Sequence, residues 1–294
     1  MLPRTSRRSL LKAGGSLAIA GVLVPSGTSA TADARLRALE RTHQARLGVY
    51  ARNLRTGHTV SYRAGERFPM CSVFKGLAVG HVLRDYDRCG AFLDRVVHYA
   101  ADDLVDHSPV TSQHVATGMP VRDLSAAALI YSDNTAANLI LQITDGPRGV
   151  TRFCRSIGDP YTRLDRNEPD VNTAIPGDPR DTTTPAAIGR TYGRLLVGHA
   201  LPAPDRRQLV NWMKANTTSA EQFRAGLPGD WVIADKTGSG DYGCTNDVGV
   251  AWTSTAVPIV FAVLSVKRAQ AAAVDYPLIA DTARILAREL APGQ

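Results

Sequence analysis

Four short segments of the chain carry residue types that together could perform acyl transfer. They are Ser72-Val73-Phe74-Lys75, Ser132-Asp133-Asn134, Lys236-Thr237-Gly238 and the segment around Glu168. Each is weak alone, because a serine three residues before a lysine occurs by chance on many helices. Along the chain the four segments follow one another at Ser72, Ser132, Glu168 and Lys236. Together, with Glu168 as a carboxylate base, they predict a serine hydrolase rather than an enzyme that only becomes acylated.

Ser72 is the predicted nucleophile. A serine hydroxyl is a poor nucleophile until a neighbouring base takes its proton. If Ser72 begins a helix, Lys75 lies one turn further on the same face, and we expect its amine to hydrogen-bond the hydroxyl. The start of the helix also leaves free backbone N–H groups directed at the site. The alternative for this motif alone is a helix N-cap beside a solvated lysine.

Ser132 and Asn134 are expected in a turn between two helices, where both side chains can project into a cleft. Ser132 is the predicted proton shuttle to the leaving nitrogen, and Asn134 the predicted donor to a substrate amide. Asp133 is expected to brace the turn. Helix capping is the alternative for all three, because Ser, Asp and Asn are preferred caps.

Lys236-Thr237-Gly238-Ser239-Gly240 is expected to end an apolar strand, and its glycines let a ligand approach the backbone closely. Lys236 offers a cation, and Thr237 and Ser239 offer hydroxyls, for a substrate carboxylate. The backbone N–H groups of Ser239 and Ser72 form a predicted oxyanion hole, in which loss of one donor typically costs about 2.7 to 4 kcal/mol. A simple strand and turn is the alternative.

Glu168 and Asn172 are four residues apart, so one helical turn would place carboxylate and amide on one side. There they could hold a single water, with Glu168 as the general base that directs it at the acyl-enzyme. Pro169 restricts Glu168 and permits a cis bond between them. The alternative is a solvated loop acid.

Metal and cofactor chemistry are not indicated by the sequence. The seven histidines form no His-x-His or His-x-x-x-His pair, and no glycine-rich phosphate cradle occurs. We therefore expect no metal, no cofactor and a small-molecule substrate.

The charge of the chain does not indicate a nucleic-acid partner. The formal net charge is +7, but four of the basic residues lie in the first 32 residues, which contain no acid. The remaining charge of about +3 is ordinary for a globular protein. No basic run interleaved with aromatic residues follows residue 32, so we expect no nucleic-acid binding.

Residues 1–32 resemble a twin-arginine export signal. Arg7 and Arg8 precede an apolar run over residues 13–24, and small residues that permit cleavage follow. The run is shorter than the roughly 18 to 20 residues that span a bilayer, so we expect no stable membrane anchor. A secreted or periplasmic location is predicted.

The order of elements predicts an α/β part and an all-α lobe. A helix over 34–46 and a strand over 47–54 open the mature chain. Helices are expected from 72 onward and over 121–130 and 134–143, with a proline-rich loop over 163–185. Strands are expected over 231–235, 247–252 and 258–266, and an amphipathic helix closes the chain.

This pattern predicts an antiparallel sheet flanked by helices, with an inserted helical lobe. The expected division assigns 33–64 and 214–294 to a discontinuous α/β lobe and 65–213, including the loop 163–185, to the helical lobe. The cleft is expected between them.

The four motifs, in this order, resemble those of the class A serine β-lactamases, and the likeness covers nearly the whole mature chain. The resemblance implies the β-lactamase/penicillin-binding-protein transpeptidase-like fold and a monomeric enzyme that hydrolyses penicillins and cephalosporins and confers antibiotic resistance. It also implies that the lactam carbonyl acylates Ser72 and that Lys75 and Glu168 share the role of base. Arg166 and Asp181 resemble the ion pair that closes the loop bearing Glu168.

Three features depart from the family pattern. His107 stands where many members place an aromatic residue at the mouth of the cleft. Different members of the family place an arginine that supports the substrate carboxylate at one of three positions, which are occupied here by Thr245, Gln222 and Tyr276. Arg224 is the arginine that could take over this role. Cys71 lacks the usual cysteine partner, because Gly240 stands at that position. Whether any of the four cysteines pair is left open by the sequence.

Two other functions share the serine and lysine logic. A penicillin-binding D,D-peptidase is acylated by the same drugs but deacylates slowly, and a penicillin sensor domain stays acylated. Glu168 and Asn172 argue against the peptidase, and the absence of a signalling segment in the sequence argues against the sensor.

Overall fold

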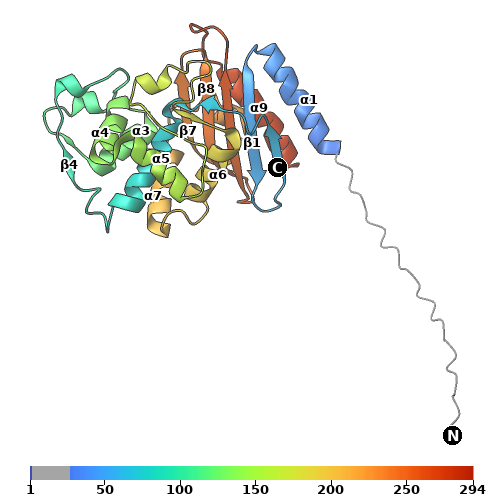
Figure 1. Cartoon of the computed structure of the whole chain (residues 1–294), viewed down its shortest axis with the longest axis horizontal. Helices are drawn as coiled ribbons and strands as arrows, with labels where there is room; N and C mark the ends of the chain where they lie inside the picture. The colour runs from blue at the N-terminus through green and yellow to red at the C-terminus, as the bar shows by residue number, and fades with distance from the viewer. Residues whose placement is uncertain (2–26, 294) are drawn as a thin grey trace.

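Figure 1 shows the computed structural model of the chain, which describes Met1 and residues 27–293. Within this part, no helix is long and apolar enough to cross a membrane. The strands are β1 (Arg46–Asn53), β2 (Thr59–Tyr62), β3 (Phe68–Pro69), β4 (Val96–Val97), β5 (Met119–Pro120), β6 (Thr182–Thr183), β7 (Val232–Gly240), β8 (Cys244–Trp252) and β9 (Pro258–Val266). The helices are α1 (Gly27–Thr42), α2 (Phe74–His81), α3 (Val121–Ile130), α4 (Asn134–Ile143), α5 (Gly146–Ser156), α6 (Pro185–Leu196), α7 (Ala203–Lys214), α8 (Phe223–Gly226) and α9 (Tyr276–Leu290).

The main sheet has five antiparallel strands in the order β2-β1-β9-β8-β7. The central strand β9 reads Pro-Ile-Val-Phe-Ala-Val-Leu-Ser-Val, and seven of its nine residues are buried. This unbroken apolar run occurs because helices cover both faces of the sheet. β7 is an edge strand and lies on the side of the sheet nearest the helical lobe (Figure 1).

Two hydrophobic clusters lie on opposite faces of the sheet. One packs α1, α8 and α9 against it through residues such as Leu36, Phe223 and Leu286. The other is larger and joins the opposite face to α6 and the remaining helices. Figure 1 shows this arrangement, with α1 and α9 beyond one side of the sheet and α3, α4, α5 and α7 grouped on the other. The segment bearing Ser72 lies where the helices meet the sheet.

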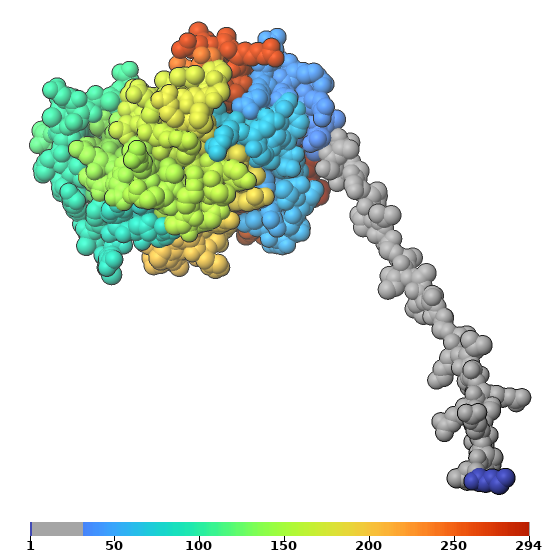
Figure 2. All heavy atoms as spheres, in the orientation of Figure 1, coloured from blue at the N-terminus to red at the C-terminus, as the bar shows by residue number. Residues whose placement is uncertain are grey.

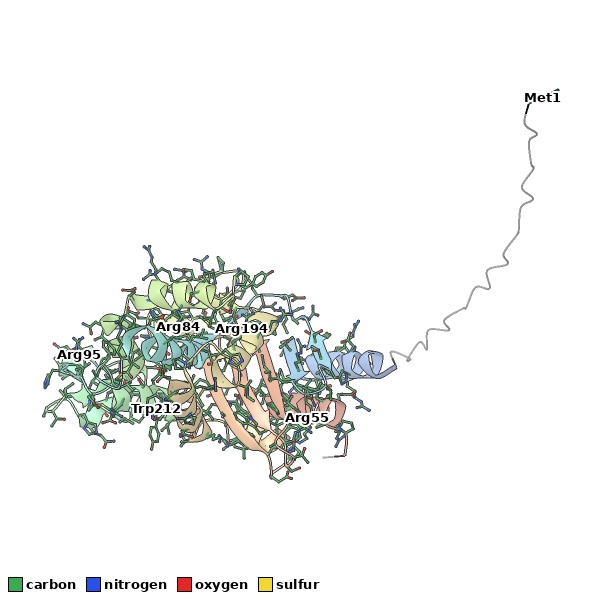
Figure 3. All side chains as sticks on the ribbon, turned by 90° about the horizontal axis from the view of Figure 1, so that it is seen from below. Met1, Arg55, Arg84, Arg95, Arg194 and Trp212 are labelled. Atoms are coloured by element: carbon green, nitrogen blue, oxygen red, sulfur yellow. The ribbon has the colours of Figure 1, made fainter. Side chains whose placement is uncertain are left out.

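The helical lobe is built around α2, whose eight residues are all buried. Two arginines from neighbouring segments bond the chain at and just after the C-terminal end of α5. Arg84 donates to Ser156 Oγ at 2.7 Å, and Arg194 donates to the carbonyl of Gly158 at 2.9 Å. Figure 3 labels both arginines, which lie on the same side of the molecule. Their contacts fix the chain just before the loop 163–185.

The structure corrects one local expectation about the lysine motif. The segment from Lys236 to Gly240 does not lie beyond the strand expected over 231–235 but continues β7, where Lys236 pairs with Val248 and Gly240 with Cys244. Pairing with β8 outweighs the low strand propensity of the two glycines. The turn is therefore at residues 241–243, and the motif faces the helices from the edge of the sheet.

Candidate active site

Ser72 lies at the junction between the sheet and the helical lobe. It occupies a single 3₁₀ turn, Cys71–Val73, and α2 itself begins at Phe74. The Ser72 side chain is nearly buried, with 8% of the residue exposed. Its hydroxyl donates a hydrogen bond to Glu168 Oε1 at 2.9 Å. A serine hydroxyl bonded to a buried carboxylate meets the geometric requirement for an activated nucleophile.

Lys75 is fully buried but does not bond the Ser72 hydroxyl, so that expectation is wrong. Its amine donates to Ser132 O at 2.7 Å and Asn134 Oδ1 at 2.6 Å, and lies 3.1 Å from Glu168 Oε1. A buried ammonium group has three N–H donors, and carbonyl, amide and carboxylate oxygens are strong acceptors for them. Burial lowers the pKa of Lys75, while the charge of Glu168 opposes this effect.

Ser132 lies in the expected turn between α3 and α4, with a left-handed φ of 59°. Its hydroxyl accepts from Lys236 Nζ at 3.0 Å and from Lys75 Nζ at 3.3 Å. When both lysines are protonated they can only donate, so the hydroxyl proton of Ser132 then points to a third group. In that state Ser132 can donate its proton.

Asp133 braces this turn through its carboxylate. It caps α4 by accepting from the N–H of Ala136, and it also accepts from the N–H groups of Val110 and Thr111. The Thr111 hydroxyl donates to it as well. The carboxylate is thus occupied by protein donors, which leaves Ser132 and Asn134 as the side chains of the motif that face Lys75.

Lys236 points from β7 toward the turn that carries Ser132. It is fully buried and donates to Ser132 Oγ and to the carbonyl of Thr237 at 2.9 Å. Burial, followed by the nearby charge of Lys75, lowers the pKa of Lys236 to about 7. The two lysines and Ser132 form a connected line from β7 to α2.

Gly238 explains how β7 approaches the nucleophile so closely. A Cβ atom at this position would lie 2.7 Å from the carbonyl oxygen of Met70 and 3.1 Å from the backbone nitrogen of Ser72. Any larger residue would push the strand away from the turn, so the glycine permits the contact. Because β7 is an edge strand, alternate N–H groups along it point away from β8.

Glu168 is 3% exposed, and its two carboxylate oxygens have different partners. Oε1 accepts from Ser72 and lies beside Lys75, whereas Oε2 accepts from the amide of Asn172. The short 3₁₀ helix Asp170–Asn172 supplies the predicted turn, and the Glu168-Pro169 bond is cis. The loop acid therefore faces the serine rather than solvent.

Asn138 is a functional residue that the sequence analysis missed. Its side chain bonds the backbone of Glu168 twice, accepting from the N–H and donating to the carbonyl, each at 2.9 Å. These bonds hold the loop backbone against α4. The signal was present in the sequence, because Asn138 lies four residues after Asn134 and so on the same helix face.

The loop from 163 to 185 is closed by Arg166 and Asp181. Arg166 Nε lies 2.6 Å from Asp181 Oδ2, and Asp181 is buried. Asp181 Oδ1 also accepts from the backbone N–H groups of Asp165 and Arg166, at 2.7 Å and 3.0 Å. Arg166 reaches further to the Thr173 hydroxyl. The two ends of the loop are thus joined, which fixes the position of Glu168 between them.

Comparison with known proteins gives a consistent result. A model of the β-lactamase enzyme family matches residues 31–290. A β-lactamase of Streptomyces fradiae is 52% identical to this chain, and the match covers 98% of this chain and 97% of the relative. β-Lactamase AST-1 of Nocardia asteroides is 54% identical, and the match covers 88% of this chain and 84% of the relative. The solved β-lactamase of Streptomyces albus G has a TM-score of 0.87 at 54% identity, and covers 88% of this chain and 99% of its own.

The chain belongs to the β-lactamase enzyme family. The resemblance to class A serine β-lactamases is confirmed, since a class A β-lactamase of the last common ancestor of Gram-negative bacteria, in mutant form, also matches with a TM-score of 0.85. The predicted fold is confirmed by the same structures. The protein is a hydrolase that opens β-lactam rings through an acyl-serine intermediate and confers antibiotic resistance.

The residues predicted to bind substrate differ in burial and in the hydrogen-bonding groups that remain free. Asn134 uses its oxygen for Lys75 and one amide hydrogen for the carbonyl of Asp106, which leaves one hydrogen for a ligand. Thr237 is buried and its hydroxyl contacts that of Thr218. Ser239 is half-buried on β7. His107 is exposed, and its Nε2 lies 3.0 Å from the carbonyl oxygen of Tyr131.

Arg224 does not supply the arginine that other family members direct at the substrate carboxylate. Its guanidinium lies 3.3 Å from the buried carboxylate of Asp235 and also donates to Ser219 Oγ and to the carbonyl of Lys214. Thr245 is fully buried, and its hydroxyl donates to the carbonyl of Gly243. Lys236 and Lys75 are therefore the two buried cations among the described residues that contact Ser132, and Lys236 is the one carried by β7.

We expect substrate recognition to weaken as pH rises through about 7. Lys236 has a pKa of about 7, so its positive charge is present below that pH and is lost above it. The second-order rate constant kcat/KM reports groups of the free enzyme, and it should fall by up to roughly tenfold per pH unit above the pKa for substrates with a ring carboxylate. The measurement is kcat/KM for benzylpenicillin between pH 6 and 9.

The control for this profile is Lys236→Arg, because a guanidinium stays protonated over the whole range. Its absolute activity can be lower, but its alkaline limb should move to higher pH. The other charged groups near Lys236 are Lys75, Glu168, Asp235 and Asp247, and all remain in the variant. An identical alkaline limb in both proteins would assign the titration to one of these groups instead.

Proposed function

We propose that Ser72 attacks the lactam carbonyl while Glu168 and Lys75 take its proton. The observation that carries this proposal is the 2.9 Å hydrogen bond from Ser72 Oγ to the buried Glu168 Oε1, with Lys75 Nζ 3.1 Å from the same oxygen. A base within hydrogen-bond reach of the nucleophile is the first requirement for general-base catalysis. The lowered pKa of Lys75 also favours the neutral amine, which can accept a proton.

The developing oxyanion is assigned to the backbone N–H groups of Ser72 and Ser239. The approach of Gly238 to Ser72 supports this assignment, since it brings the edge of β7 against the nucleophile turn. Two such donors stabilise the tetrahedral intermediate because they point at the charge before it forms.

Ser132 donates a proton to the leaving lactam nitrogen. Its hydroxyl already accepts from Lys75 and Lys236, so its own proton is free for this transfer. Lys75 then restores the proton of Ser132, since it contacts both Ser132 and Glu168. Lys236, Thr237 and Ser239 bind the ring carboxylate, Asn134 donates to the side-chain amide of the substrate, and His107 borders the cleft.

Deacylation uses a water held by Glu168 and Asn172. Their side chains are bonded to each other, and Glu168 also faces the nucleophile, so a water in this position lies close to an acyl group on Ser72. Glu168 takes a proton from this water, and the hydroxide attacks the acyl carbonyl. The ester bond to Ser72 then breaks, and Glu168 returns the proton to Ser72 Oγ. The ion pair of Arg166 and Asp181 holds the loop that makes this possible.

The test of this function is repeated turnover of the chromogenic cephalosporin nitrocefin. The purified chain without residues 1–32 should hydrolyse many equivalents of nitrocefin and leave no lasting mass increase. A D,D-peptidase or a penicillin sensor would give one equivalent of colour change and a stable acyl-protein. A burst of one equivalent without further turnover would therefore contradict the proposal.

We further propose that the protein is exported by the twin-arginine pathway to a secreted or periplasmic location, acts as a monomer on penicillins and cephalosporins, and needs no cofactor. Most of the predicted signal, residues 1–32, lies outside the described residues, and α1 begins within the cleavage zone at Gly27.

We also propose the division into an α/β lobe, residues 33–64 and 214–294, and a helical lobe, residues 65–213. It is supported by the different helices that cover the two faces of the main sheet. One helix of the segment 65–213, α6, also packs on this sheet.

A further inference from the structure

Two cysteines meet behind the nucleophile turn. Cys71 directly precedes Ser72, and Cys244 is the first residue of β8, 173 positions later. Both are fully buried, and their sulfur atoms lie 3.5 Å apart. Both carry free thiols, so this pair joins the active-site turn to the sheet without a covalent bond.

The surroundings hold the two sulfurs toward each other. Asn246 donates from its amide to the carbonyls of Pro69 and Met70, at 3.0 Å and 3.2 Å, and so ties the chain before Cys71 to β8. Cys244 Sγ itself lies 3.7 Å from the Pro69 carbonyl. The backbone segments that carry the two thiols are therefore already fixed side by side.

Gly240 separates this pair from any partner on β7. A Cβ atom at Gly240 would lie 2.9 Å from Cys71 Sγ and 2.3 Å from the carbonyl of Asn172. No side chain fits there without displacing Asn172. The sulfur of Cys71 thus has one thiol neighbour, which is Cys244.

We propose that Cys71 and Cys244 are an oxidative modification site, at which a peroxide closes a disulfide between the nucleophile turn and β8. Two S–H bonds and the O–O bond of the peroxide break, and the S–S bond forms. The two thiols lose two electrons and two protons, and hydrogen peroxide is reduced to two waters. The sulfurs must approach from 3.5 Å to about 2.05 Å for the bond to form.

The oxidant can approach through a groove beside the pair. A cavity of about 1290 Å³ lies between the loop segment 174–179 and the segment 266–269, and Pro69, Ala174 and Val266 are among its lining residues. Ala174 and Val266 also pack against the two cysteines. In Figure 2 the yellow surface of the loop region lies beside the orange-red surface of the C-terminal third. Ala174 and Val266 thus both line the groove and contact the cysteines.

The reaction should be slow compared with that of an exposed thiol. The hydrogen bond with Cys244 and burial raise the pKa of Cys71, which lowers the fraction of reactive thiolate. In the wild-type protein, the exposed Cys89 is the fast reference. Cys154 is the unpaired reference in the same protein, because it is buried, burial raises its pKa too, and no thiol contacts it within the described chain.

The experiment uses the double variant Cys89→Ser/Cys154→Ser, which retains only the pair. After hydrogen peroxide treatment and denaturation, N-ethylmaleimide should label no thiol, the intact mass should fall by two hydrogens, and reduction should restore two labelled thiols. Nitrocefin turnover, measured before and after treatment, shows that the protein is folded when it is oxidised. Retained turnover is expected, because none of the hydrogen bonds of Ser72 or Glu168 passes through a sulfur.

The disulfide should also stabilise the fold, because it closes a long loop in the unfolded chain. We expect the Tm to rise by about 5 to 10 °C on oxidation and to return on reduction. Cys244→Ser in the same background should lose both the mass change and the Tm shift. Two labelled thiols after treatment, or sulfinic acid on Cys71 without a crosslink, would overturn the proposal. If the double variant does not fold, the oxidised wild type can be analysed by peptide mapping. The proposal would then be overturned by a peptide in which Cys71 is linked to a residue other than Cys244, or is linked to none.

Discussion

Replacing Glu168 with alanine is expected to arrest the enzyme after acylation. Glu168 contacts both the Ser72 hydroxyl and Asn172, so it is the only described carboxylate placed to activate a water against the acyl group. Loss of a general base typically costs 10² to 10⁴ in rate, and the steady-state turnover should fall by roughly that factor. Intact mass spectrometry after a short incubation with benzylpenicillin should then show the protein plus one drug molecule.

Acylation itself should survive in this variant. The charge of Glu168 raises the pKa of Lys75, which burial already lowers, so removing Glu168 lets that pKa fall further. More neutral amine is then present to take a proton from Ser72. The acyl-enzyme therefore forms faster than it decays, which is the condition for its accumulation.

Asp170→Ala is the matched control, because this acid lies two residues away on the same loop but is exposed. Its turnover should stay within about twofold of the wild type, as expected for an exposed surface substitution. If Glu168→Ala hydrolysed nitrocefin at the wild-type rate with no mass increase, the deacylating base would be another group.

The regular elements of this fold were largely predictable, because they are fixed by hydrophobic periodicity. The helices over 121–130 and 134–143 and the strand over 258–266 have the predicted bounds. β7 was predicted too short, since Lys236 and two glycines have low strand propensity and only pairing with β8 keeps them extended. α1 starts earlier and ends earlier than predicted, at Gly27 and Thr42.

The residues of the candidate site could be named from the sequence, but their contacts could not. Motif spacing places Lys75 near Ser72, whereas the choice of acceptors for a buried amine depends on groups from α4 and the loop that are distant in sequence. Asn138 could have been found from its helical spacing to Asn134. The contact between Cys71 and Cys244 joins positions 173 apart, and no local pattern encodes it.

Replacing Ser72 with alanine is expected to abolish covalent labelling. The Ser72 hydroxyl is bonded to Glu168 and lies on the turn that β7 approaches through Gly238, so its loss removes the atom that forms the acyl bond. Loss of a catalytic nucleophile can reduce turnover by about 10⁶-fold, and nitrocefin hydrolysis should fall at least 10³-fold. A fluorescent penicillin followed by denaturing electrophoresis measures the labelling directly.

Ser125→Ala provides the matched control for this loss. Ser125, on α3, is also buried, but its hydroxyl has no hydrogen-bond partner in the described chain and therefore no bond to a carboxylate. Removing an unsatisfied buried hydroxyl should leave labelling and turnover unchanged and cost no stability. Labelling and turnover should depend on Ser72, whose hydroxyl is bonded to a base, because burial of a hydroxyl does not make it nucleophilic. Persistent labelling of Ser72→Ala would move the nucleophile to another residue, with Ser132 the first to test because it lies between the two lysines.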